Sequence, residues 1–153
     1  MVHLDIRKLL KIIILSLLVS NSAFAETKEE KRAKYVLLNM QQDYIACYSF
    51  YKIGSEYVKK SNGDKSTIDG IEKSSDLSLK LAHDTGEMMD MTIDEMSIKV
   101  KSEMKNQLDL VGNNFKNAAA LLEKYAQNCK NLIENKKKRI SFWEKKAKEK
   151  ING

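Results

Sequence analysis

The sequence predicts an all-α protein, arranged as a disulfide-linked antiparallel bundle of three or four helices. The 153 residues include no proline, a residue that helix interiors exclude and β-rich proteins usually contain. Charged residues make up 31% of the chain. Apolar residues recur every three or four positions over long stretches, which places them on one face of a helix.

The first predicted helix covers residues 28–60. Its apolar stripe alternates between spacings of three and four residues, which is the repeat of a single helix face. The segment 61–64 then ends the helix, because Ser, Asn, Gly and Asp favour turns and left-handed caps. The stripe consists of Leu37, Met40, Tyr44, Cys47, Tyr51, Gly54 and Val58.

The second predicted helix begins after Ser66, which we expect to be its N-cap, and ends near Asp90. It is the weakest of the predicted helices, since glycine and serine residues interrupt its apolar pattern. We expect its buried side to consist of Ile68, Ile71, Leu81, Ala82 and Met89.

The third predicted helix has the clearest start, because the segment from Thr92 to Glu95 (Thr-Ile-Asp-Glu) forms a capping box. The apolar residues that follow keep a four-three spacing from Met104 to Leu132. We expect Asn135 and the lysines after it to end this helix. A short last helix is predicted around residues 140–150.

Cys47 and Cys129 lie on two of these stripes, and we expect a disulfide between them because the chain is predicted to be exported. In an up-down-up bundle with an unbroken third helix, they would lie about 40 Å apart along the axis. Bonded cysteines need Cα atoms about 6 Å apart. Either the third helix breaks at 112–114 and gives a four-helix bundle, which we favour, or the chain forms a long kinked helical hairpin with its tip at Met91.

Residues 1–25 have the three parts of a cleavable signal peptide. A basic start precedes a short apolar run, and Ala23-Phe24-Ala25 is a small-x-small cleavage site. The apolar run of about eight residues is too short for a membrane span, which needs about 20, although an uncleaved anchor is the alternative. We expect cleavage near Ala25 and a periplasmic or secreted location. Lysine far exceeds arginine, which fits a bacterial source.

The net charge of +6 is concentrated in the C-terminal segment. Residues 26–129 hold 15 Lys or Arg and 17 Asp or Glu, whereas residues 130–153 hold 9 and 3. We therefore divide the chain after the signal peptide into a helical domain, 26–135, and a basic amphipathic helix, 136–153.

A basic amphipathic helix with an aromatic residue is typical of contact with an anionic membrane surface or an acidic envelope protein. The alternative is that the helix packs its tryptophan into the core and leaves its lysines in solvent. Nucleic acid is not an expected partner, because no recognition motif is present. The predicted surface-binding residues are Lys136, Lys137, Lys138, Arg139, Trp143, Lys145 and Lys146.

Four methionines lie within nine residues of one another, shortly after the only histidine beyond residue 25. Thioether sulfur is a ligand for Cu(I), so copper handling is an alternative function, although flexible methionines more often fill gaps between helices. His83 and Glu87 lie one helical turn apart, but two ligands leave a metal site incomplete. The candidate metal ligands are Met88, Met89, Met91, Met96 and His83.

No motif in the sequence indicates catalysis or a bound cofactor. The one histidine beyond residue 25 has no nucleophile arranged beside it in the sequence, and neither a phosphate-binding loop nor a Cys-x-x-Cys motif is present. We expect Tyr44, Tyr48, Tyr51 and Tyr57 to pack in the core, with an apolar ligand groove as the alternative. The sequence therefore predicts a non-enzymatic binding protein of the cell envelope.

Overall fold

The computed structural model describes residues 26–112 and 115–152, and the regular elements within these ranges are all helices. The all-α prediction is confirmed for this part of the chain, whereas the predicted signal peptide lies outside the described residues. The helices are α2 (Lys28–Lys60), α3 (Lys65–Glu87), α4 (Ile93–Val111), α5 (Ala118–Glu134) and α6 (Lys136–Asn152).

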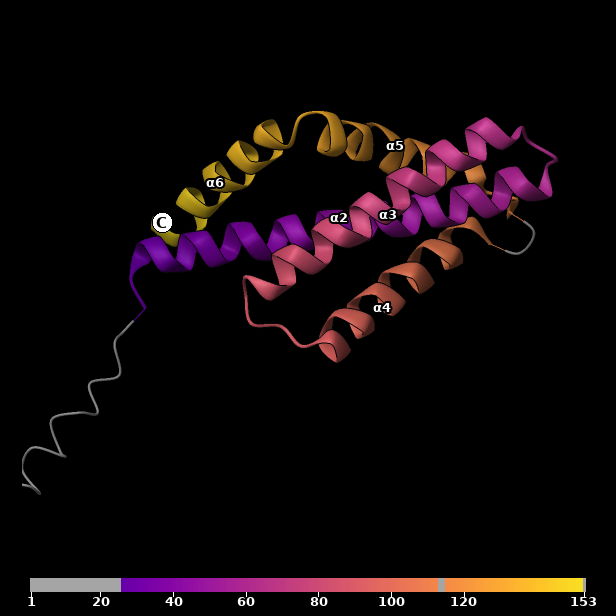
Figure 1. Cartoon of the computed structure of the whole chain (residues 1–153). Coiled ribbons are helices and arrows are strands. Elements are labelled where there is room, and N and C mark those ends of the chain that lie inside the picture. Colours follow the sequence, from indigo (N-terminus) through magenta and orange to yellow (C-terminus); the bar gives the residue numbers. More distant parts are fainter. Residues whose placement is uncertain (1–25, 113–114, 153) are drawn as a thin grey trace, which may run out of the picture.

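The long helix α2 is the axis of the molecule, and each of the other four described helices packs against it. Figure 1 shows α3 running back along the C-terminal half of α2, and α4 running in the direction of α2 beside that half. After the next turn, α5 and α6 follow one another in the opposite direction, so that α6 reaches the start of α2 (Figure 1). Three helices, α3, α4 and α5, thus surround the C-terminal part of α2, and α6 covers its N-terminal part.

The ends of α2 agree with the predicted range of 28–60. A capping box holds its start, because the Glu30 backbone N–H donates to the Thr27 hydroxyl at 3.2 Å and the Thr27 N–H donates to the Glu30 carboxylate at 2.7 Å. Its end is a tight turn in which Asn62 adopts a left-handed φ of 55° and the Gly63 N–H donates to the Val58 carbonyl at 2.9 Å.

The start of α3 differs from the prediction, because its N-cap is Asp64 rather than Ser66. The Asp64 carboxylate accepts the backbone N–H of Thr67 at 2.9 Å, and the extended backbone of Asp64 aims its side chain at this group. Ser66 lies inside the first turn instead. The helix also ends earlier, at Glu87, and Asp90 has a left-handed φ of 56° in the turn that follows.

The buried side of α3 consists mainly of small and hydroxylated residues, which the prediction of an apolar side did not foresee. Leu77 and Leu79 are 41% and 38% exposed. Two buried hydroxyls bond back to their own helix, since Ser78 donates to the Ser74 carbonyl at 2.8 Å and Thr85 donates to the Leu81 carbonyl at 2.7 Å. The buried residues are Ser75, Ser78, Ala82, Thr85 and Gly86.

The predicted capping box at the start of α4 is confirmed. The Glu95 N–H donates to the Thr92 hydroxyl at 3.2 Å, and the Thr92 N–H donates to the Glu95 carboxylate at 2.8 Å. These two bonds satisfy backbone donors that have no partner inside the helix.

The predicted third helix is broken, as the bundle arrangement requires. α4 ends at Val111 and its C-cap Gly112 has a φ of +71°, which L side chains rarely adopt. The next described helix, α5, begins at Ala118 and runs back along α2. The break brings Cys129 to the level of Cys47, whereas an unbroken helix would have left them far apart.

The last helix is longer than the predicted 140–150. α5 ends at Glu134 with Asn135 as its C-cap, as expected, but α6 begins directly at Lys136, so the lysine run starts a helix and does not end one. Lysine has good helix propensity, and nothing in the run interrupts the backbone.

Candidate functional site

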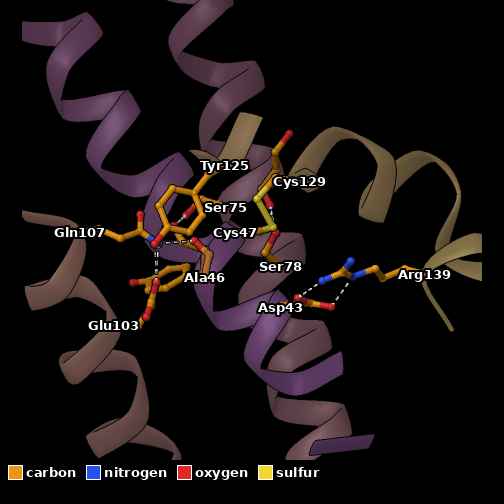
Figure 2. The surroundings of a disulfide bond; sticks show 12 residues. Asp43, Ala46, Cys47, Ser75, Ser78, Glu103, Gln107, Tyr125, Cys129 and Arg139 are labelled. Carbon is orange, nitrogen blue, oxygen red and sulfur yellow. Dashed lines mark hydrogen bonds and ion pairs between the residues drawn. A yellow bond between two sulfur atoms is a disulfide. The ribbon is translucent and has the colours of Figure 1, made fainter. Parts of the chain in front are cut away.

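A partly buried carboxylate, Asp43 of α2, holds α6 against α2. The Arg139 guanidinium donates to it from Nε to Oδ2 at 2.6 Å and from Nη2 to Oδ1 at 2.8 Å, as Figure 2 shows. The Trp143 indole donates from Nε1 to Oδ2 at 2.6 Å. The Arg139 and Asp43 side chains are 27% and 19% exposed. A two-point, charge-assisted pair fixes orientation as well as position, so α6 is held at a defined angle.

The remainder of α6 also turns its apolar face to α2. Ala147 is fully buried, and the ring of Trp143 meets the ring of Tyr35 edge-on, with 6.2 Å between centroids. The Lys150 ammonium lies 5.1 Å from the centroid of the same Tyr35 ring, a cation–π contact. The apolar side of this helix is therefore used within the molecule.

The outer side of α6 is exposed and strongly basic. The helix carries eight Lys or Arg and two Glu. One exposed ion pair lies on it, between Lys146 and Glu149 at 2.9 Å. We call its exposed basic side the lysine face, which consists of Lys136, Lys137, Lys138, Lys145 and Lys146.

The structure divides the seven predicted surface-binding residues into two groups. Arg139 and Trp143 turn inward to Asp43, which is the packing alternative considered for the tryptophan. The five lysines point to solvent. Binding of a partner by the lysine face stays a prediction, and the inward pair gives that face a fixed place on the molecule.

The predicted disulfide is present and joins α2 to α5. The Cα atoms of Cys47 and Cys129 are 5.3 Å apart, and both residues are buried. Figure 2 shows Ser75 and Ser78 of α3 beside the bond. Small side chains at these positions let α3 approach it closely, so a reductant reaches the sulfurs only when helices separate.

The tyrosine stripe of α2 runs from buried to exposed. Tyr44 is buried, and burial raises the pKa of its phenol to about 12, with the negative charge of the neighbouring Asp43 adding to the rise. Burial also raises the pKa of Tyr51, with a contribution from Glu134. Tyr57, near the end of the helix, is 42% exposed. The prediction of core packing therefore holds best for Tyr44.

The candidate copper ligands are not gathered in one place. Met96 is buried and lines a hollow between α2, α3 and α4, where His83 also lies. Met88 is 70% exposed and lines a different hollow, between α2 and α6. Ligand atoms of His83, Asp84 and Glu87 lie within 4.8 Å of one another, but all three residues are exposed. A soft Cu(I) site needs several sulfurs at one point, whereas Met88 and Met96 line different hollows.

Two residues that sequence reasoning missed are Asp43 and Gln41 of α2. Both lie beside the apolar stripe, where a polar residue is usually solvated. No sequence signal links Asp43 to Arg139, because 96 residues separate them. The amide of Gln41 is fully buried, which the stripe pattern gave no reason to expect.

Comparison with known proteins finds no matching family model, no similar curated protein and no similar solved structure. None of the helices that the structure describes is long and apolar enough to cross a membrane. The class defined by the fold is therefore an all-helical protein with one internal disulfide, and the disulfide is compatible with a location outside the cytoplasm.

Proposed function

We propose that this protein is a non-enzymatic binding protein of the bacterial cell envelope, whose lysine face contacts an acidic surface. The observation that supports this proposal is the pinning of α6. The pair formed by Asp43 and Arg139 fixes one side of the helix on α2 and leaves five lysines exposed on the other. A fixed array of cations loses less conformational freedom on binding than a flexible tail does.

The proposed contact is electrostatic, and it does not insert α6 into the lipid. An interfacial helix buries an apolar face in the lipid, but α6 turns Ala147, which is fully buried, and Ile140 and Trp143, which are partly buried, toward the core. Lysines near an anionic surface contribute about 1 kcal/mol each, and this attraction falls within a Debye length, about 8 Å at physiological salt. The contact should therefore weaken strongly as salt rises.

The location proposed for this contact is the periplasm or the outside of the cell. The signal-peptide pattern before Ala25 predicts export, and the buried disulfide supports it because such bonds form and persist in oxidising compartments. An envelope offers both kinds of acidic surface, anionic lipid and acidic protein.

The test compares a variant of the lysine face with a charge-matched control. In the first, all five lysines of the face become glutamine. In the control, five exposed lysines elsewhere become glutamine: Lys52, Lys65, Lys73, Lys80 and Lys116. Sedimentation with phosphatidylglycerol vesicles, and retention on immobilised polyglutamate, measure binding to lipid and to acidic polypeptide.

We expect the wild type and the control variant to bind at low salt and the lysine-face variant to lose at least 100-fold in affinity. Equal losses in both variants would show that net charge alone matters, and would contradict a defined face. A wild type that binds neither vesicles nor polyglutamate would overturn the proposal. Intact helix content by circular dichroism shows that the variants are folded.

Copper handling is the second candidate function, and one observation favours it: His83 and Met96 line the same hollow. Competition with a Cu(I) chelator of micromolar affinity tests it. A protein that handles copper should withdraw the metal from the chelator, and a variant with Met96→Leu and His83→Gln should not. Failure of the wild type to compete would remove this candidate.

A further inference from the structure

A hollow of about 350 Å³ lies where α2 ends, between α2, the start of α3, the end of α4 and the start of α5. Figure 1 shows these segments at one end of the molecule, whereas the end of α6 lies at the other. All of the residues that line the hollow are apolar, aromatic or glycine. We call it the Gly54 hollow, and its walls include Phe50, Ile53, Ile71, Val111, Phe115 and Leu121.

Gly54, in the interior of α2, forms part of the wall and leaves this space open. A Cβ atom at Gly54 would meet nothing within 4 Å, so empty space lies directly beside the helix backbone. A close neighbour or a positive φ explains the glycines at Gly63, Gly86 and Gly112, but neither reason applies to Gly54. Because glycine inside a helix costs stability relative to alanine, the chain keeps this space at a cost.

Large apolar side chains remain exposed at the mouth of the Gly54 hollow. Tyr57 and Leu122 line it and are 42% and 56% exposed. The rings of Tyr57 and Phe115 lie 5.5 Å apart between centroids. Apolar surface that stays in contact with water gains free energy when a hydrocarbon covers it. The mouth therefore favours an apolar ligand over a polar one.

A cation also lies at this mouth. The Lys60 ammonium is 4.8 Å from the centroid of the Phe115 ring. The neighbouring Lys59 is held in ion pairs with Glu56 and Glu72, at 3.1 Å and 2.6 Å. Among the residues that the structure describes, no carboxylate forms such a pair with Lys60. An anionic head group at the mouth would therefore meet a cation that is not already paired.

We propose that the Gly54 hollow binds a fatty acid of about ten carbons, with its chain in the hollow and its carboxylate beside Lys60. A methylene group is about as large as a water molecule, whose share of liquid volume is about 30 Å³, so about ten such groups fill the hollow. A lipid with two chains exceeds this volume. Sugars and nucleotides do not fit the walls, because their polar groups would lose hydration without gaining partners.

Sodium decanoate below its micelle concentration is the probe, and decylammonium, with the same chain and the opposite charge, is its control. In ¹³C-correlated spectra of the oxidised protein, decanoate should shift the methyl resonances of Ile71 and Leu122, which line the hollow. The methyl resonances of Ile140, on α6, should stay in place. For twelve heavy atoms we expect a Kd of about 0.1 mM.

Two related ligands test the chain and the head group separately. Octanoate should bind about tenfold more weakly than decanoate, because it buries two fewer methylenes. Decylammonium should also bind about tenfold more weakly, because its charge repels Lys60 where a carboxylate is attracted.

Gly54→Leu should fill the hollow and weaken decanoate at least tenfold. Gly70→Leu is the matched control, because a Cβ atom at Gly70 also meets nothing within 4 Å but this residue is exposed and does not line the hollow. The control variant should bind decanoate like the wild type. Both variants replace a helix glycine with a better helix former, so both should fold.

Lys60→Gln tests the place of the head group. It should weaken decanoate about threefold, which is the size of an exposed ion pair, and should not weaken decylammonium. Lys80→Gln, at an exposed position of α3, should change neither affinity. The variant that lacks all five lysines of the lysine face should also bind decanoate like the wild type, so this proposal and the proposed function succeed or fail separately.

Four results would overturn the proposal. The first is an absence of methyl shifts with decanoate at ten times the expected Kd. The second is equal affinity for decanoate in wild type and Gly54→Leu, and the third is decylammonium binding as tightly as decanoate. The fourth is a dimer, detected by analytical ultracentrifugation, that Gly54→Leu disrupts and decanoate does not, which would assign the hollow to a second copy of the chain.

Discussion

Asp43 lies one helical turn before Cys47 on α2, so the ion pair that holds α6 and the disulfide that holds α5 start from adjacent positions of one helix. The two residues are about 6 Å apart along the axis. Figure 2 shows both links in one view. The last two helices, α5 and α6, are thus fastened to the middle of α2 at two neighbouring points, one covalent and one ionic.

Replacing Asp43 with asparagine should release α6 from α2. The change keeps the shape but removes the charge that pairs with Arg139, leaving that cation without its partner. Hydrogen bonds to charged groups contribute about 1.5–3 kcal/mol, so we expect a loss of about 2 kcal/mol in the free energy of unfolding. Trp143 is the only tryptophan, and its emission should shift to the red as the ring meets water.

Asp109→Asn is the matched control for this prediction. Asp109 pairs with Lys105 four residues away on α4, and both side chains are largely exposed, so its loss should change stability by less than about 0.5 kcal/mol. Urea unfolding followed by far-UV circular dichroism measures both variants. Unchanged emission and an unchanged urea midpoint in Asp43→Asn would show that the ion pair does not hold α6.

Removing the disulfide should destabilise the protein at least as much as removing the ion pair. The bond closes a loop between residues 82 positions apart, and its loss typically costs about 2–5 kcal/mol. A Cys47→Ala, Cys129→Ala variant should show a lower urea midpoint that reductant does not alter. The wild type should shift to a similar midpoint only after reduction. Two thiols that react with an alkylating agent in the folded, unreduced protein would contradict the bond.

Local sequence signals predicted much of this fold. Thr92 and Glu95 specify a helix start by themselves, and Met40, Tyr44 and Cys47 of the predicted α2 stripe are buried. The break at Gly112 was the favoured one of two arrangements that allow Cys47 and Cys129 to meet, the other being the long kinked hairpin. Each of these inferences depends on neighbouring residues or on one covalent constraint.

The parts that were missed depend on tertiary contacts. Ser66 has the composition of a cap, but Asp64 has the backbone conformation that reaches Thr67. The buried serines of α3 are core residues because α2 lies close to them. The role of Asp43 required knowing that α6 returns to the start of α2, and no local pattern contains that information.

Replacing Gly112 with alanine should destabilise the turn between α4 and α5. Its φ of +71° with ψ of 179° lies in a region that only glycine adopts readily. The nearest atom to an added Cβ would be Asn117 Nδ2 at 3.9 Å, so the cost comes from the backbone alone, about 1–3 kcal/mol. Alanine would also favour continuing α4 as a helix.

Gly70→Ala separates this backbone effect from the general effect of alanine. Gly70 is inside α3, and a Cβ there would meet nothing within 4 Å. The free energy of unfolding of this variant should therefore rise by about 0.5–1 kcal/mol. The thermal or urea unfolding midpoints of Gly112→Ala and Gly70→Ala should therefore shift in opposite directions, down for the first and up for the second. An increase in stability in both variants would mean that Gly112 is not held at a positive φ in solution.

Stability should fall between about pH 10 and pH 12, and Tyr44 should account for a distinct part of the fall. Burial and Asp43 raise the pKa of the folded phenol to about 12, whereas the unfolded phenol has an ordinary pKa near 10. Above pH 10 the unfolded state therefore releases a proton that the folded state retains, and the free energy of unfolding decreases as pH rises. The contribution is fully present below pH 10 and is lost as pH approaches 12.

Tyr44→Phe should remove this part of the slope, which amounts to about 3 kcal/mol across the window. Lysine titration and alkaline attack on the disulfide affect both proteins alike, so the informative quantity is the difference in unfolding free energy between wild type and variant at each pH. That difference should be constant below pH 10 and should change steadily above it. If the Tyr44→Phe difference is flat across the whole pH range, the phenol ionises in the folded protein as easily as in the unfolded chain, and burial does not raise its pKa.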